Sequence, residues 1–115
     1  LDESREAALI AITTDPAQPR EVGAARFSAA PDGRAEVAVV VSDDWRLRGL
    51  GTLLMRRLID IARSRGIRVL YSVDPASNEA MQRFASSLGF ERMSDPSDAT
   101  QVVHTLELQP ARVTS

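Results

Sequence analysis

The hydrophobic period changes in the middle of the chain, and this change constrains the fold more than any other feature. Residues 35–42, "AEVAVVVS", form an apolar, mostly β-branched run, which is typical of a central strand. From Gly49 to Ser64 the apolar residues recur with the period of a helix, and Gly66 is the expected stop. The pattern therefore predicts a strand, a short loop and an amphipathic helix. The apolar face of that helix comprises Leu50, Leu54, Leu58 and Ile61.

The rest of the chain adds strands and a second helix, in the order β-β-β-α-β-α-β-β. The expected fold class is α/β (α+β), with a mixed, mostly antiparallel sheet flanked by helices. We expect one domain over residues 1–115 with a disordered tail at 109–115, and the start at Leu1 suggests a fragment of a larger protein. The other strands are expected at 7–13, 22–29, 67–73, 90–93 and 102–108, the second helix at 78–88, and a polar loop at 94–101.

Composition excludes several classes of site. The 115 residues include no cysteine and one histidine, His104, which excludes a disulfide framework, a cysteine nucleophile and a thiolate or histidine metal cluster. His104 lies in a late strand and is expected to be structural. The net charge of −2 argues against broad nucleic-acid binding. Neither a signal peptide nor a membrane-length apolar run is present, so we expect a cytoplasmic protein.

Two glycines, Gly49 and Gly51, stand where the helix begins, and three interpretations compete for them. A dinucleotide fingerprint needs a third glycine where Leu54 stands, and it needs the strand to end directly before the motif. Asp74 lies at a suitable distance for a ribose contact, but the fingerprint itself fails. A phosphate-binding Walker loop needs a lysine, and the chain has none.

A helix start with free amides and nearby arginines remains, which is a common anion site. Arg46 and Arg48 would add charge-assisted donors to it. The alternative is that the glycines only shape the entry to the helix and that the arginines are solvated.

Two motifs resemble those of the GNAT N-acetyltransferase superfamily. The R-x-x-G-x-G motif of Arg46, Gly49 and Gly51 is similar to its acetyl-CoA pyrophosphate signature, and "NEAMQRFASSLGF" at 78–90 matches its second signature in spacing. Among relatives, the chain looks most similar to the acetyltransferase domain of bacterial Pat-type protein lysine acetyltransferases. The resemblance covers about residues 7–108. It implies the GNAT fold and acetyl transfer from acetyl-CoA to a primary amine, with a protein lysine as the expected acceptor.

The resemblance also implies how acetyl-CoA would be held, without a metal. The backbone of a strand would pair with the pantetheine arm, the amides that open the helix would hold the pyrophosphate, and Asn78 would contact the pantetheine end. Asn78 has a compatible alternative role as a plain helix cap. The implied residues are Val39, Val40 and Val41 for the arm, with Arg46, Arg48, Gly49, Leu50, Gly51 and Thr52 for the pyrophosphate.

Glu36 is the candidate general base, because a lysine amine must lose a proton before it attacks. Partial burial in the apolar strand would make it a stronger base. The alternative is an exposed carboxylate just after the Asp32–Gly33 turn. Members of the family commonly place a tyrosine acid where this chain has Ala85, and Tyr71 is expected to serve the sheet. No general acid is therefore assigned.

The acceptor and the wider assembly stay open at this level. Complete members of the family begin with a strand and two helices that shape the acceptor groove, and this chain starts after them. Pat-type proteins join the domain to an acyl-CoA-synthetase-like part, which is a possible fused or associated partner. The two alternative functions are a non-catalytic acyl-CoA-binding regulatory module and a small-molecule amine acetyltransferase.

Overall fold

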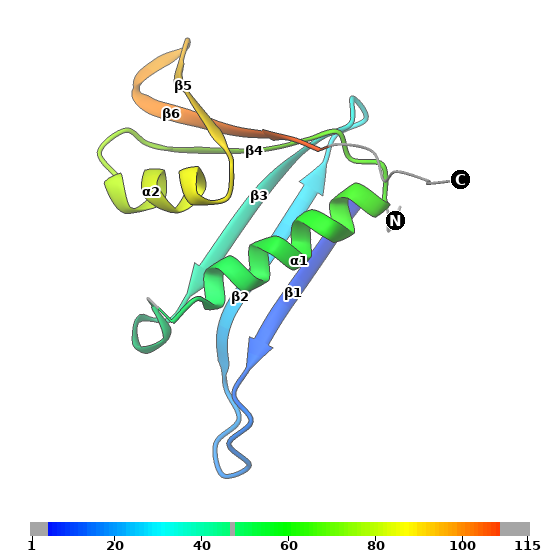
Figure 1. Ribbon diagram of the computed structural model, residues 1–115, viewed down its shortest axis with the longest axis vertical. Helices are drawn as coiled ribbons and strands as arrows, with labels where there is room; N and C mark the ends of the chain where they lie inside the picture. Colours follow the sequence, from blue (N-terminus) through cyan, green and yellow to red (C-terminus); the bar gives the residue numbers. More distant parts are fainter. Residues whose placement is uncertain (1–4, 47, 109–115) are drawn as a thin grey trace.

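The computed structural model describes residues 5–46 and 48–108, which form one sheet of six strands and two helices (Figure 1). This element order is the one expected from the sequence. No helix in these two ranges is long and apolar enough to cross a membrane. The expected disordered tail at 109–115 lies outside the described residues. The elements are β1 (Glu6–Ile12), β2 (Glu21–Ala29), β3 (Arg34–Val41), α1 (Leu50–Ser64), β4 (Val69–Pro75), α2 (Glu79–Ser87), β5 (Glu91–Asp95) and β6 (Asp98–Glu107), with a short 3-10 helix at Asp43–Trp45.

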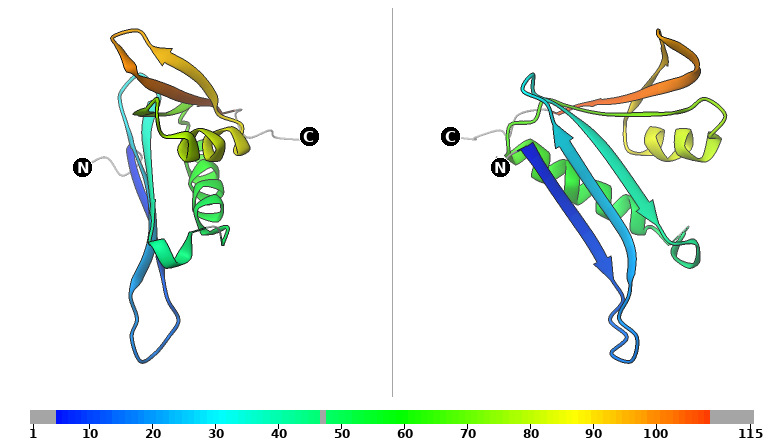
Figure 2. Two further views of the ribbon diagram at one scale, coloured as in Figure 1. Left: turned by 90° about the vertical axis from the view of Figure 1, so that its left-hand side faces the viewer. Right: turned by 180° about the vertical axis from the view of Figure 1, so that it is seen from behind.

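The sheet is split into two arms. Its strand order is β1-β2-β3-β4-β6-β5, and every neighbouring pair is antiparallel except β3 and β4. Those two strands pair only from Arg34 to Glu36, against Val69 to Tyr71. Beyond this point they diverge, so that β1–β3 and β4–β6 form the two sides of a wedge (Figures 1 and 2). The main chain of each strand therefore has an unpaired stretch that faces the opening.

Helix α1 covers one face of the β1–β3 arm, and the core lies between them (Figure 2). The helix buries Leu54 and Leu58 as its period predicts, against Phe27 on β2 and Leu70 on β4. Each fully buried side chain of this size contributes roughly 1.5–3 kcal/mol. The helix ends at Ser64, just before Gly66, whose φ of 80° suits glycine. This confirms the predicted stop.

The opposite face of β3 is not covered by any described residue, which corrects the expectation for this strand. Ala35 and Val37 are buried, but Glu36 and Ala38, which alternate with them along the strand, are exposed, and Val40 is 69% exposed. The strand is central in the order of the sheet, yet only one of its faces packs against a helix. Apolar residues on both faces of β3 therefore predicted its central place in the sheet correctly. They did not predict that only one of its faces is buried.

The polar loop predicted at 94–101 is wrong, because most of it belongs to a tight hairpin. Strand β5 extends to Asp95 and β6 begins at Asp98. The side chain of Asp95 accepts the N–H of Ser97 at 2.9 Å, and that of Asp98 accepts the N–H of Thr100 at 2.9 Å. Aspartates that bond the backbone two residues ahead stabilise turns. Polar strand residues beside such a turn look like a loop in sequence.

Candidate functional site

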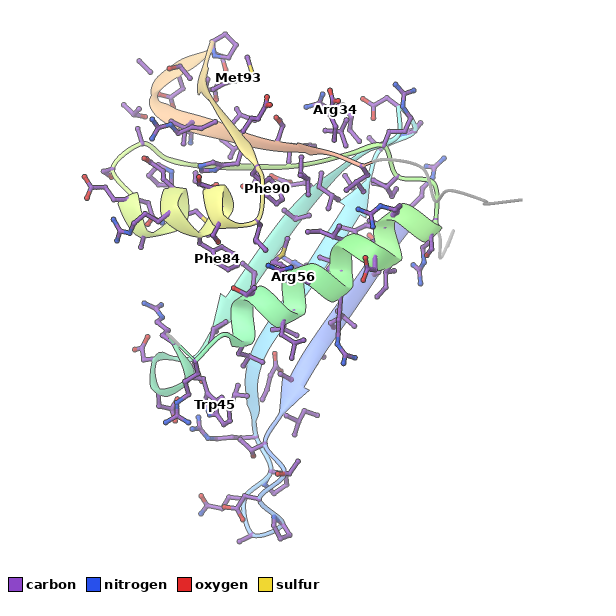
Figure 3. The ribbon with its side chains drawn as sticks, in the orientation of Figure 1. Arg34, Trp45, Arg56, Phe84, Phe90 and Met93 are labelled. Carbon is purple, nitrogen blue, oxygen red and sulfur yellow. The ribbon has the colours of Figure 1, made fainter. Side chains whose placement is uncertain are left out.

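A cleft of about 840 Å³ lies where β3 and β4 diverge. Both Glu36 and Val37 line it, although successive residues of a strand point to opposite faces of the sheet. The cleft therefore passes through the sheet from one face to the other. Helix α2 closes it on the packed side with Met81 and Phe84. Figure 3 shows Phe84 beneath α2, between that helix and the start of α1.

The β4-facing edge of β3 forms one wall of the opening. Val39, Val40 and Val41 pair with β2 on one side, but their pairing with β4 has already ended at Glu36. An unpaired strand edge can bond an extended ligand as if it were another strand. The three predicted residues therefore lie at an edge of the required kind.

The N-terminus of α1 is open in the way the glycine motif predicts. Gly49 is the N-cap, with a φ of 82°, and no side chain caps the helix. The first turn contains no acidic residue, and the N–H of Leu53 is the first to bond within the helix, to the carbonyl of Gly49 at 3.0 Å. The amides of Leu50, Gly51 and Thr52 therefore precede the first helical hydrogen bond and remain for an anion.

The two predicted arginines both lie in the loop before α1, and both are exposed. Arg46 forms an ion pair with Asp43 at 3.3 Å. The guanidinium of Arg48 lies over the ring of Trp45, 5.0 Å from its centre. This contact between a cation and an aromatic ring holds Arg48 against the loop, near the start of the helix. Figure 3 shows Trp45 in this loop below the N-terminus of α1.

Asn78 caps α2 as expected. Its side-chain oxygen accepts the N–H of Met81 at 3.1 Å. The residue is exposed, and no hydrogen bond from its amide nitrogen to a described residue is seen. The cap uses the oxygen only, so the nitrogen can still donate to a ligand.

Glu36 lines the cleft from the open face of the sheet. It lies opposite Ser28 on β2 and Tyr71 on β4, at the last pair before the strands separate. The partial burial expected from the apolar strand is wrong, because α1 covers the other face and Glu36 is exposed. Within the described part of the chain it has no hydrogen bond or ion pair. A free carboxylate at the apex of the wedge can accept a proton.

A buried polar cluster on the packed face was not recognised from the sequence. Oδ2 of Asp74 accepts the hydroxyl of Ser72 at 2.7 Å and lies 2.8 Å from Nδ1 of His104. Ser72 and Asp74 line the cleft, and the His104 side chain is 1% exposed. His104 was expected to be structural and is fully enclosed, while Asp74 was considered only for a ribose contact. Two polar residues at alternate positions of a strand, on the side of buried Leu70, were the available signal.

The described residues offer an anion site and a carboxylate but no metal site. No group of three or more His, Asp or Glu within 5–46 and 48–108 could hold a metal ion. A long ligand with phosphates at one end would meet free amides at α1, an open strand edge along β3, and Glu36 at the apex.

Comparison with known proteins agrees with this geometry. The chain is 43% identical over 109 residues to an acetyltransferase from Pseudomonas aeruginosa. These aligned residues make up 94% of this chain and 59% of that protein. It is 39% identical over 59 residues to an L-methionine sulfoximine/L-methionine sulfone acetyltransferase of Pseudomonas paraeruginosa, over 51% of this chain and 34% of that one. The chain thus spans less than two thirds of the length of these relatives.

Solved structures share the fold. The GNAT domain of S. lividans PAT superposes with a TM-score of 0.81 at 22% identity, over 94% of this chain and 64% of that one. A GNAT-family acetyltransferase from Streptococcus pneumoniae gives 0.79 at 18% identity, over 94% and 70%. The sequence model of the Acetyltransferase (GNAT) family matches residues 3–90. The chain therefore belongs to the GNAT family of acetyltransferases.

Proposed function

We propose that this chain transfers an acetyl group from acetyl-CoA to a primary amine, with Glu36 as the general base. The observation that carries the proposal is the cleft through the split sheet. It places Glu36 on one face and the α2 side chains on the other. Two reactants can therefore enter from opposite faces and meet at the apex, which is the arrangement that direct transfer requires.

The residues that hold acetyl-CoA are proposed from the open main-chain groups. The amides of residues 48–52 and the charges of Arg46 and Arg48 fit a pyrophosphate. The edge of Val39–Val41 fits the amide-bearing pantetheine arm, which supplies an activated acetyl thioester. Phe84 lines the cleft and also lies near Gly51, where an added Cβ would be 3.5 Å from its ring. Phe84 thus lies beside both the start of α1 and the cleft, on the path that such a ligand would follow.

Glu36 is proposed to take the proton of the attacking amine. A primary amine with a pKa of ~10.4 is almost wholly protonated at neutral pH, so a base must remove a proton before the nitrogen can attack. The new N–C bond then forms and the C–S bond breaks. A backbone amide near Val40 or Val41 would stabilise the developing oxyanion.

A protein lysine is the acceptor that we propose first, and the likeness to the PAT domain in fold supports it. The cleft mouth on the open face of the sheet is also accessible to a lysine side chain. A small amino-acid amine is the second candidate, because one relative is named for L-methionine sulfoximine. A non-catalytic acyl-CoA-binding module is the alternative if no amine is acetylated.

Glu36→Gln tests the proposal, with Glu6→Gln as the matched control. Glu6 on β1 lines the same cleft from the same arm of the sheet, so its replacement removes a similar charge without removing the base. We expect Glu36→Gln to lower kcat by on the order of 10²–10⁴-fold, while calorimetry shows unchanged acetyl-CoA affinity. Glu6→Gln should retain most activity. Equal activity of the two variants would refute the role of Glu36.

Acetylation of a lysine peptide and of free amino acids by the unmodified protein separates the two acceptor classes. Turnover of the peptide alone supports the lysine proposal, and turnover of free amino acids alone supports the second candidate. Acetyl-CoA binding without turnover of any amine would favour the regulatory module.

A further inference from the structure

Members of this family commonly have a tyrosine that acts as general acid at one position, and this chain has no acidic side chain there. Ala85 stands there, lines the cleft and is buried. A methyl group cannot give a proton to a departing thiolate. Ser72 and Asp74 line the same cleft from β4, on the face of the sheet that α2 covers. Ser72 and Asp74 therefore lie in the same cleft as Ala85, whose side chain cannot act as an acid.

The three polar groups of this cluster form one continuous path, which begins beneath α2 and ends in the cleft. Nδ1 of His104 is 2.8 Å from Oδ2 of Asp74, and the Ser72 hydroxyl is 2.7 Å from the same oxygen. A hydroxyl hydrogen rotates freely about its C–O bond, so Ser72 can turn from Asp74 to a group in the cleft. Because Oδ2 of Asp74 lies within hydrogen-bond distance of both His104 and Ser72, a proton can pass from one to the other through this oxygen.

His104 is the proton source that this path can use. Its ring is fully enclosed, and within the described chain Nε2 has no hydrogen-bond partner. All of the polar contact of the ring therefore goes through Nδ1 to Asp74.

We propose that His104, Asp74 and Ser72 deliver the proton that the departing sulfur needs, in place of the missing tyrosine. This proposal rests on the proposed acetyl transfer. The imidazolium of His104 gives its Nδ1 proton to Oδ2 of Asp74, Oδ2 passes a proton to Oγ of Ser72, and Ser72 gives its own hydroxyl proton to sulfur. One S–H bond forms and one N–H bond is lost. Asp74 ends as a carboxylate, Ser72 as a hydroxyl and His104 as a neutral ring, which regains its proton by the same path when the cleft reopens to solvent.

The charges around His104 come from three elements, β4, β5 and α2. Asp74 on β4 is its partner, and Arg92 on β5 is its cross-strand neighbour. Glu79 and Arg83 on α2 line, with His104, a second depression between α2 and β5. The ring therefore has one carboxylate in direct contact, and the two arginines lie on the side away from the cleft path.

The first test compares two thioesters that differ in the acidity of the leaving thiol. An ordinary thiol has a pKa near ~8.5, whereas 4-nitrothiophenol is far more acidic and leaves without a proton. We expect Ser72→Ala and His104→Gln to lower the rate with acetyl-CoA by on the order of 10²-fold. The rate with S-acetyl-4-nitrothiophenol should stay within about twofold. Ser28→Ala is the control, since Ser28 lines the cleft from the other face and has no bond to the cluster.

Equal losses with both thioesters, or no loss with either, would overturn the relay. His104→Gln removes a buried ring, so its thermal unfolding is measured beside its kinetics. Ser72→Ala deletes one oxygen from a half-buried residue, and it decides the outcome if the histidine variant does not fold.

The second test does not depend on turnover. Because the chain has a single histidine, a ¹⁵N NMR titration reports His104 without assignment. We expect the titration midpoint of the protein with coenzyme A to differ from that with desulfo-coenzyme A, and Asp74→Asn to abolish the difference. Identical titrations would mean that the cluster only joins β4 to β6. A protein that acetylates no amine but shows the NMR difference would refute the proposed function and keep the path to sulfur.

Discussion

The two helices begin in opposite ways, although each lies beside the same cleft. Helix α1 starts at Gly49, which has no side chain and leaves the first amides without a cap. Helix α2 starts at Asn78, whose side-chain oxygen bonds the N–H of Met81. The first helix therefore leaves its positive end for a ligand, and the second satisfies its own.

Because of this difference, we expect the start of α1 to contribute to ligand binding and the start of α2 to contribute to stability. A capped helix gains about 1 kcal/mol from its own side chain. An uncapped helix forgoes that energy, and an anion can supply it on binding. Changes at α1 should therefore affect coenzyme affinity first, and changes at α2 should affect unfolding first. The following substitutions test that division.

Gly51→Asp should have the largest effect. A carboxylate in the first turn of α1 would occupy the positive end and repel the phosphates, at a cost of several kcal/mol for close like charges. We expect coenzyme A affinity to fall at least about 100-fold, or roughly 2.7 kcal/mol, by calorimetry. The melting temperature should not fall, since an acid near a helix N-terminus is favourable.

Gly51→Ala separates charge from size at the same position. An added Cβ would lie 3.5 Å from both Phe84 and Val41, which is ordinary van der Waals contact. We expect the alanine variant to keep coenzyme affinity within about fivefold, because it fits and adds no charge. If alanine weakens binding as much as aspartate, closeness of the backbone rather than charge governs the site.

Gly49→Ala should have the next largest effect, and on stability. The φ of 82° at Gly49 lies in the left-handed region, but a Cβ there would meet nothing within 4 Å. The cost is therefore backbone strain alone, about 1–2 kcal/mol in urea unfolding. Gly49→Asn should cost less, because asparagine tolerates this conformation. Equal costs for both variants would show that the loop relaxes away from this backbone angle.

Asn78→Ala should cost about 1 kcal/mol through the lost cap, which corresponds to a fall in Tm of roughly 4–8 °C for a domain of this size. Asn78→Asp keeps an equivalent cap but replaces the amide nitrogen with an oxygen. If that nitrogen contacts the coenzyme, the aspartate variant loses affinity while its Tm is kept. Unchanged affinity in Asn78→Asp would leave Asn78 as a cap alone.

The sequence predicted best what depends on local pattern. The period of Leu50 to Ile61, the stop at Gly66 and the open start at Gly49 all follow from neighbouring residues, and all are present. Likewise, the order of strands and helices along the chain followed from the alternation of their hydrophobic periods. Element type and the uncapped glycine start of α1 could therefore be predicted from the residues alone.

What failed depends on contacts between distant segments. Glu36 looked partly buried because its neighbours are apolar, but only the packing of α1 decides which face of β3 is covered. Asp74 and His104 are 30 residues apart, and only the pairing of β4 with β6 brings them to 2.8 Å. The hairpin at Asp95 to Asp98 was hidden by polar strand residues. No local pattern contains these partners.

The smallest expected effect concerns how the loop before α1 is held. Asp44 accepts hydrogen bonds from Arg20 and from Ser42, and these, the Arg20 bond first, hold the pKa of this carboxyl below its ordinary value of 3.8. A lowered pKa contributes stability that is present above the unfolded value and is lost as the pH falls through the folded one. Because both side chains are more than half exposed, solvent screens the pair and the contribution is small.

The free energy of unfolding of Asp44→Asn should therefore fall less than that of the unmodified protein when the pH is lowered below about 4. Urea unfolding at a series of pH values measures this difference. At pH 7 the variant should lose only a little stability, because solvent screens an exposed pair. Coenzyme affinity should fall only slightly, since the proposed anion site is made by the amides of α1 and not by Asp44. A large loss of affinity at neutral pH would show that the anchored loop, and with it Arg46 and Arg48, contributes more to the site than the uncapped helix does.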